Sequence, residues 1–218
     1  DRQPSLLREI RPRHVLPLAA FLLVFAAAWL PFYDNWRWTG TGDSISFFNA
    51  GYNLYHNGLT QSPWSVHGID DVFTQLWEIA YNLWVFVFGP TFFGHRFGYL
   101  VMSCLALAAI YAFFALEIGI GWALAITIAT ATNYVWLVFS YMSWGKIDSF
   151  LFTYAALACG LVVWRHSERF LPWAVTGFVG GLALFFTPVS WTANGFVGLG
   201  LTLVALRHRR FAQWFVYT

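Results

Sequence analysis

Charge is scarce in this sequence, and the scarcity excludes several classes of protein. Its 218 residues hold 12 Lys and Arg and 10 Asp and Glu, so 10% are charged, against about 25% in a typical soluble domain. A single lysine and the lack of a basic stripe argue against nucleic acid as a partner. The two cysteines, Cys104 and Cys159, lie in apolar runs, which excludes a disulfide-rich secreted scaffold.

Apolar residues are abundant instead, at 59% of the chain with 21% aromatic. Intrinsic disorder is excluded because disordered chains are poor in both. The composition therefore predicts an all-α integral membrane protein whose partner is the lipid bilayer. A spanning helix needs about 20 residues. About six transmembrane helices are predicted, at Val15–Phe32, Phe97–Leu116, Trp122–Met142, Ser149–Trp164, Trp173–Phe186 and Thr192–Leu206.

A seventh apolar stretch, Val72–Gly89, has a polar stripe and is interpreted differently. Asp71, Gln75, Glu78 and Asn82 recur at spacings of four, three and four, which places them on one face of a helix. The pattern predicts an amphipathic helix over 71–88 that lies in the membrane interface and does not span it.

The distribution of basic residues supports this topology. With a cytoplasmic N-terminus and 71–88 lying flat, three cations fall outside: Arg37, Arg96 and Lys146. The cytoplasmic side then holds Arg2, Arg8, Arg11, Arg13, Arg165, Arg169, Arg207, Arg209 and Arg210. This asymmetry follows the positive-inside rule, whereas a spanning 72–89 helix would divide the cations equally. The chain is predicted to be a multi-pass protein with its N-terminus in the cytoplasm.

The first external segment, residues 33–96, contains a second predicted amphipathic helix at 44–56. Ile45, Phe48, Tyr52 and Tyr55 form one face, and the Asn57-Gly58 pair is typical of a helix C-terminus. No internal repeat or separate soluble domain is visible, so residues 1–218 are predicted to form a single membrane domain. The chain begins at Asp1 and ends in an aromatic run, which we interpret as features of a fragment.

The predicted external face carries the varied polar chemistry. Asp43 opens the helix at 44–56, where a carboxylate can act as a general base toward a hydroxyl acceptor or simply cap the helix. Lys146 and Asp148 can bind a phosphate headgroup or form an ion pair at a helix start. Arg96 has the same two interpretations, binding or interfacial anchoring. The candidate substrate-binding residues are Arg96, Lys146, Asp148, His56 and Glu78. The histidines lack metal-ligand spacing, so neither a metal centre nor a cofactor is predicted.

The order of several short motifs resembles the GT-C superfamily of membrane glycosyltransferases. The segment Gly42-Asp43 followed by Phe47-Phe48-Asn49-Ala50-Gly51 is similar to the opening of the family's first external loop. Phe88-Gly89 with Arg96, the segment 145–151, and Gly177 through Ala183 resemble the starts of later spans. The resemblance covers roughly residues 15 to 206 and is closest to bacterial members that use polyprenyl-phosphate sugars, such as mannosyltransferase-like enzymes.

This resemblance implies a bacterial plasma membrane enzyme that moves a sugar from a polyprenyl-phosphate donor to an acceptor on the outer face. Asp43 occupies the position of the family's catalytic loop aspartate, and Arg96 with Lys146 would hold the donor phosphate.

The sequence also departs from the family. Ser44 replaces the acidic residue that often follows the aspartate, no lysine follows the fifth span at Phe185-Phe186-Thr187-Pro188, and the spans are few. The alternative hypothesis is therefore a non-catalytic GT-C-like subunit with a structural or assembly role, whose partners would be other membrane proteins.

Overall fold

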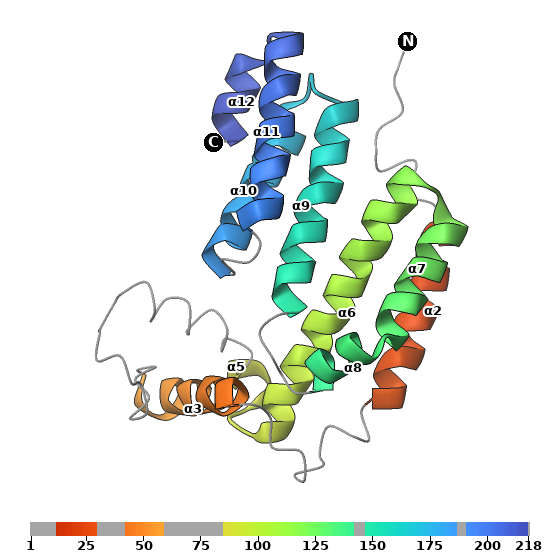
Figure 1. The fold of residues 1–218 in the computed structure, drawn as a ribbon. Helices are drawn as coiled ribbons and strands as arrows, with labels where there is room; N and C mark the ends of the chain where they lie inside the picture. Colours follow the sequence, from red (N-terminus) through yellow and green to blue (C-terminus); the bar gives the residue numbers. More distant parts are fainter. Residues whose placement is uncertain (1–11, 30–41, 59–84, 142–146, 187–190, 218) are drawn as a thin grey trace.

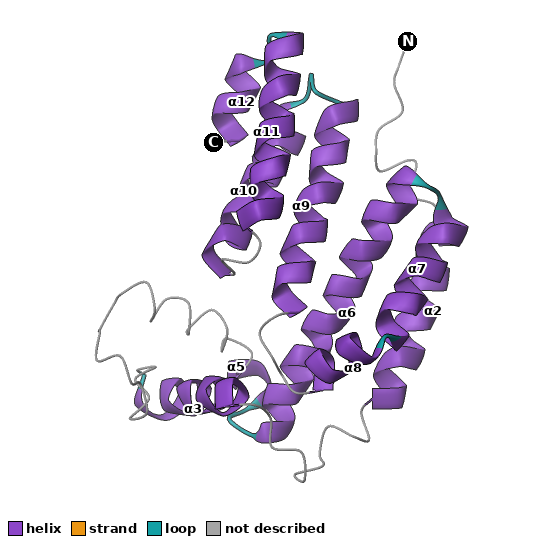
Figure 2. Cartoon of the chain, in the orientation of Figure 1, coloured by secondary structure: helices purple, strands orange, loops and turns teal. Residues whose placement is uncertain are grey.

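The computed structural model describes residues 12–29, 42–58, 85–141, 147–186 and 191–217 (Figure 1). All regular secondary structure in these residues is α-helical (Figure 2), as the composition predicts. The helices are α2 (Pro12–Trp29), α3 (Gly42–Asn57), α5 (Val85–Phe88), α6 (Phe92–Glu117), α7 (Ile120–Thr132), α8 (Tyr134–Tyr141), α9 (Ile147–Arg165), α10 (Phe170–Phe186), α11 (Trp191–His208) and α12 (Phe211–Tyr217).

Within the described residues, α2, α6, α7, α9, α10 and α11 run alternately up and down between two ends of a bundle (Figure 1). Their positions follow the six apolar stretches of the sequence. Helices α3, α5 and α8 lie at one end, which we call the α3 end. The α9–α10 and α11–α12 turns lie at the other, which we call the arginine end (Figure 1). In the part of the chain that the structure describes, one segment, Phe93–Glu117, is both long and apolar enough to cross a membrane.

Helix α9 is central, because it packs against α6, α10 and α11. Two clusters of buried side chains result. The first joins α2, α6, α7 and α8 through Phe25, Leu100, Ala106, Leu107, Ile110, Ala131 and Trp136. The second joins α9, α10 and α11 through Val163, Trp173, Val197, Leu201, Val204 and Ala205.

The third predicted span, 122–142, is broken in the structure. Helix α7 ends before Asn133, which has an extended backbone at φ −66° and ψ 135°. The Asn133 side chain accepts a hydrogen bond from the backbone N–H of Val135, at 2.9 Å, and so caps α8. Thr127 and Thr130 donate to carbonyls four residues earlier, a bonding pattern that bends helices. Hydropathy counts these residues as one apolar run and does not detect the break.

The predicted amphipathic helix at 44–56 is present as α3. It ends at Asn57, and Gly58 then has a φ of +68° with its N–H bonded to the Leu54 carbonyl, which confirms the predicted C-terminus. Of the second predicted helix, at 71–88, residues 71–84 lie outside the described part of the chain. Its last turn is helical, as α5.

The predicted apolar face of α3 is only partly buried. Leu54 and Gly51 are buried, whereas Tyr52 and Tyr55 are each 46% exposed. Both tyrosine rings contact the His56 ring: Tyr52 in a tilted arrangement at a centroid distance of 4.4 Å, and Tyr55 edge-on at 5.2 Å. Periodicity locates an apolar face but does not distinguish contact with protein from contact with an interface.

The C-terminal helix α12 packs closely against α10 at Gly177. A Cβ atom at Gly177 would lie against the Tyr217 backbone, 3.0 Å from its Cα and carbonyl carbon. Gly181, one turn further along α10, has open space around it. Trp214 also donates a hydrogen bond to the Thr202 hydroxyl, at 3.1 Å, which holds α12 against α11.

Gly177→Ala is expected to lower the free energy of unfolding by about 1–3 kcal/mol, because the new methyl group meets backbone that cannot rotate away. Gly181→Ala is the matched control and should be neutral or stabilising by up to about 1 kcal/mol. Thermal and denaturant unfolding in detergent measures both. Equal stability of the two variants would contradict the packing at Gly177.

Candidate functional site

The start of α6 is fixed by a tight connection from α5. Gly89 ends α5 with a φ of +78°, a conformation that favours glycine. Thr91 then caps α6, because its hydroxyl accepts a hydrogen bond from the Gly94 N–H at 3.0 Å. A Cβ at Gly94 would lie 2.7 Å from the carbonyl oxygens of both Phe88 and Gly89. The first turn of α6 therefore rests directly on the end of α5.

This connection buries two basic side chains, His95 and Arg96. Their exposed fractions are 1% and 5%. For Arg96 the sequence left two interpretations open, ligand binding or interfacial anchoring, and the structure adds that its side chain is buried. A guanidinium and an imidazole are costly to bury unless their polar groups are satisfied. Arg96 lies in the second turn of α6, near a helix N-terminus, whose backbone N–H groups favour anions.

Aromatic contacts join α3 to this buried pair. The Phe48 ring of α3 meets the His95 ring edge-on at 5.8 Å, and Tyr99 meets His95 from one turn further along α6 at 5.0 Å. Tyr55 of α3 contacts Phe86 of α5 at 6.1 Å, and Phe88 of α5 contacts Phe97 of α6 at 4.6 Å. Helices α3, α5 and α6 therefore form one packed unit at the α3 end of the bundle.

The candidate residues from the sequence fall into three groups. Arg96 is buried within the α3–α5–α6 unit, and His56 is exposed in the last turn of α3. Asp43 lies in the first turn of α3, and Asp148 lies in the first turn of α9; their side chains are outside the described part of the structure. Lys146 and Glu78 also lie outside the described residues. The first turns of α3, α6 and α9 nevertheless share the α3 end of the bundle (Figure 1).

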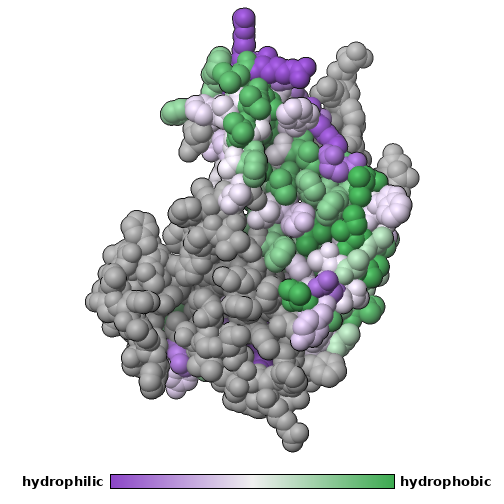
Figure 3. Space-filling view, in the orientation of Figure 1, coloured by the Kyte–Doolittle hydropathy of each residue, from purple (hydrophilic) through white to green (hydrophobic). Residues whose placement is uncertain are grey.

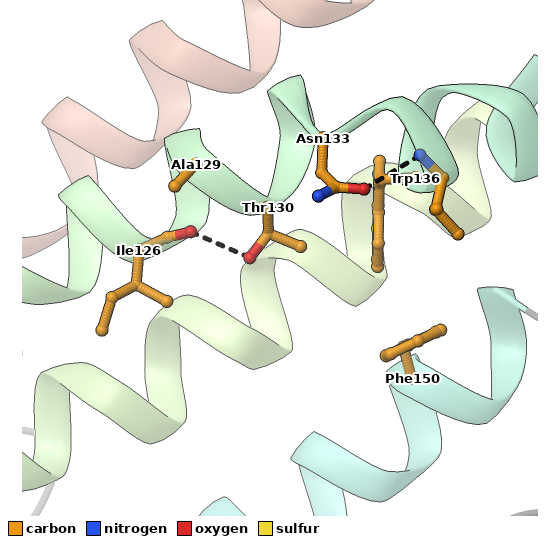
Figure 4. A pocket seen from close by; sticks show the side chains of 7 residues that line it. Ile126, Ala129, Thr130, Asn133, Trp136 and Phe150 are labelled. Atoms are coloured by element: carbon orange, nitrogen blue, oxygen red, sulfur yellow. Dashed lines mark hydrogen bonds between the residues drawn. The ribbon is translucent and has the colours of Figure 1, made fainter.

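A cavity of about 410 Å³ lies beside the α7–α8 break (Figure 4). Its lining includes Ile126, Thr130, Asn133, Trp136 and Phe150 and is predominantly apolar. Trp136 is fixed by a 3.0 Å hydrogen bond from its indole nitrogen to the Ser103 hydroxyl of α6, and it meets Phe150 of α9 edge-on at 5.3 Å. Phe150 follows Asp148 by two residues, so the cavity adjoins the start of α9.

No three His, Cys, Asp or Glu side chains among the described residues are grouped so that they could hold a metal ion. Arg96 and His95 are the buried basic side chains among the described residues at the α3 end.

His95 is the residue that sequence reasoning passed over. A lone histidine beside an arginine has no motif of its own, so its burial could not be inferred from spacing. The available signal was Gly94, since a glycine inside the first turn of an apolar helix indicates a close backbone approach.

Gly94→Ala is expected to expose His95 to solvent, because the added methyl group would collide with the two carbonyls beneath it. Modification by diethyl pyrocarbonate, read by mass spectrometry, measures this exposure, with the exposed His56 as an internal reference. Gly121→Ala, which places its methyl in open space, should leave His95 protected. An unmodified His95 in Gly94→Ala would contradict this packing.

No family model, no curated protein and no solved structure matches this chain.

Proposed function

We propose that the protein is a GT-C-type membrane glycosyltransferase, which moves a sugar from a polyprenyl-phosphate donor to an acceptor on the outer face of a bacterial plasma membrane. The observation that carries the proposal is the buried Arg96 near the N-terminus of α6; its neighbour His95 contacts Phe48 of α3, the helix that bears Asp43. In this mechanism Arg96 binds the donor phosphate through its planar fork of N–H donors. Asp43 removes the proton of the acceptor hydroxyl as that oxygen attacks the anomeric carbon of the sugar. The bond from that carbon to the phosphate oxygen breaks, and polyprenyl phosphate leaves with the electron pair.

In this proposal the six alternating helices span the bilayer and the N-terminus is cytoplasmic. Large apolar side chains that are exposed on them support contact with lipid, for example Leu23 of α2 at 71%, Phe178 of α10 at 67% and Phe196 of α11 at 71%. The arginine end would face the cytoplasm, as the positive-inside rule requires. The α3 end, with its site, would then face outward, and α3 would lie in the interface.

The cavity beside the α7–α8 break supports a lipid-linked donor. An isoprenoid tail is apolar, and a predominantly apolar cavity at the α3 end would admit part of it while the phosphate lies at Arg96. A broken helix at membrane depth is tolerated where it is buried or lines a cavity. We assign Lys146, Asp148, His56 and Glu78 to the same substrate-binding face as part of this proposal.

The test is donor turnover by the purified chain in lipid nanodiscs. Polyprenyl-phosphate mannose is supplied with a membrane extract as the source of acceptors, and release of free polyprenyl phosphate is measured. Release above that of nanodiscs without protein is expected. Binding of the donor with no turnover in any extract would instead favour the non-catalytic subunit, which should co-purify with other membrane proteins. If the chain neither binds the donor nor turns it over, the glycosyltransferase proposal is rejected.

A further inference from the structure

The arginine end of the bundle has cations in excess over the carboxylates that could neutralise them. Glu117 pairs with Arg165 at 3.3 Å, and Glu168 pairs with Arg169 at 3.7 Å. In the part of the chain that the structure describes, the arginines of the α11–α12 turn form no ion pair. They are Arg207, Arg209 and Arg210. Figure 3 shows hydrophilic side chains gathered at this end of α11 and α12, with hydrophobic surface below them.

A groove of about 320 Å³ runs along the bundle beneath this end, between α6, α9 and α11. Its lining is mostly apolar and includes Phe113, Leu157, Trp164, Phe196 and Leu201. Gly200 opens the α11 side of the groove, because a Cβ there would meet nothing within 4 Å. One carboxylate, Glu117, lines the groove, and its charge is already balanced by Arg165.

The groove and the excess charge lie on the same face of α11. Phe196, Gly200, Leu203 and Arg207 follow one another at spacings of four, three and four, which is one stripe of an α-helix. Phe196 and Gly200 line the groove, Leu203 is exposed, and Arg207 occupies the last turn. The stripe therefore leads from the groove along α11 to an arginine that has no ion pair among the described residues.

We propose that this groove is a binding site for an anionic phospholipid, with an acyl chain in the slot and the headgroup phosphate at Arg207. An acyl chain matches the apolar lining, and a phosphate matches both the charge and the fork of the guanidinium. A zwitterionic lipid offers the same chain but also places its own cation beside the arginines. The site lies at the opposite end of the bundle from Arg96, so it is distinct from the proposed donor site and does not depend on sugar transfer.

The test compares phosphatidylglycerol with phosphatidylcholine carrying identical acyl chains. Native mass spectrometry measures the dissociation constant of each lipid from the detergent-purified chain. The wild-type chain should bind phosphatidylglycerol more tightly. Arg207→Gln should weaken that binding about fivefold, the effect of roughly one basic residue near an anionic lipid surface, and leave phosphatidylcholine unchanged. Arg169→Gln, which removes an arginine already paired with Glu168, is the charge-matched control and should change neither affinity.

The groove is tested separately by Gly200→Leu, whose side chain would fill it. This variant should weaken binding of both lipids at least tenfold. Gly195→Leu is the matched control, because Gly195 is on the same helix, lies outside the groove and also has open space around it. It should leave the binding of both lipids unchanged. Equal wild-type affinity for the two lipids, or unchanged binding in Gly200→Leu, would overturn the proposal. Displacement of phosphatidylglycerol by inorganic phosphate at equal concentration would also overturn it, because a free anion would then suffice.

Discussion

Asp43→Asn is expected to reduce sugar transfer by about 100- to 10,000-fold, the usual contribution of a general base. The substitution keeps the shape of the side chain and removes its ability to accept a proton. Asp43 lies in the first turn of α3, where a carboxylate also interacts favourably with the helix dipole, by about 0.3–1 kcal/mol. Losing about 0.3–1 kcal/mol of this helix-dipole interaction should leave the variant folded. It is also too small to explain a rate change of about 100-fold or more.

The experiment measures kcat and KM for polyprenyl-phosphate mannose with Asp43→Asn, together with thermal unfolding. Glu117→Gln is the matched control, because it makes the same carboxylate-to-amide change at the arginine end, where Glu117 pairs with Arg165. Its transfer rate should stay within about twofold of wild type, since a base far from the acceptor contributes nothing to proton transfer. Wild-type transfer in a folded Asp43→Asn variant would exclude Asp43 as the base.

The helical elements could be predicted from the sequence because hydropathy and helix-end signals act locally. Six apolar stretches correspond to α2, α6, the α7–α8 pair, α9, α10 and α11. Gly58 ends α3 where the Asn57-Gly58 pair predicts. The break at Asn133 was not predicted, because it depends on side-chain hydrogen bonds from Asn133 and the threonines before it. Amino-acid composition does not show whether a polar side chain forms a hydrogen bond with the backbone of its own helix.

The burial of the candidate site is less predictable, since it depends on contacts between segments far apart in the chain. Arg96 was identified from its position, but its burial was not predicted, nor were the contacts beside it of α5 with Gly94 and of Phe48 with His95. A spacing rule can place a residue on a helix face, but it cannot determine which segment covers that face. Periodicity likewise places Tyr52 and Tyr55 on the apolar face of α3, but it does not show that both side chains are exposed.

Arg96→Gln is expected to raise the KM for the lipid-linked donor about 10- to 150-fold. This range corresponds to the loss of hydrogen bonds to a charged group, about 1.5–3 kcal/mol. Free polyprenyl phosphate, which carries the same phosphate without the sugar, should lose affinity by a similar factor. Arg96→Lys keeps the charge but not the planar fork, so its donor KM should fall between those of wild type and Arg96→Gln.

Because Arg96 is 5% exposed, its replacement could also disturb packing, and the readouts must separate the two effects. A purely structural role predicts a lower unfolding temperature and loss of active protein, which reduces kcat and leaves KM unchanged. A phosphate-binding role predicts a raised KM for the donor and weaker inhibition by polyprenyl phosphate, with rescue by lysine. Arg165→Gln, an exposed arginine at the opposite end, should leave the donor KM unchanged. An unaltered KM in a folded Arg96→Gln variant would remove Arg96 from the donor site.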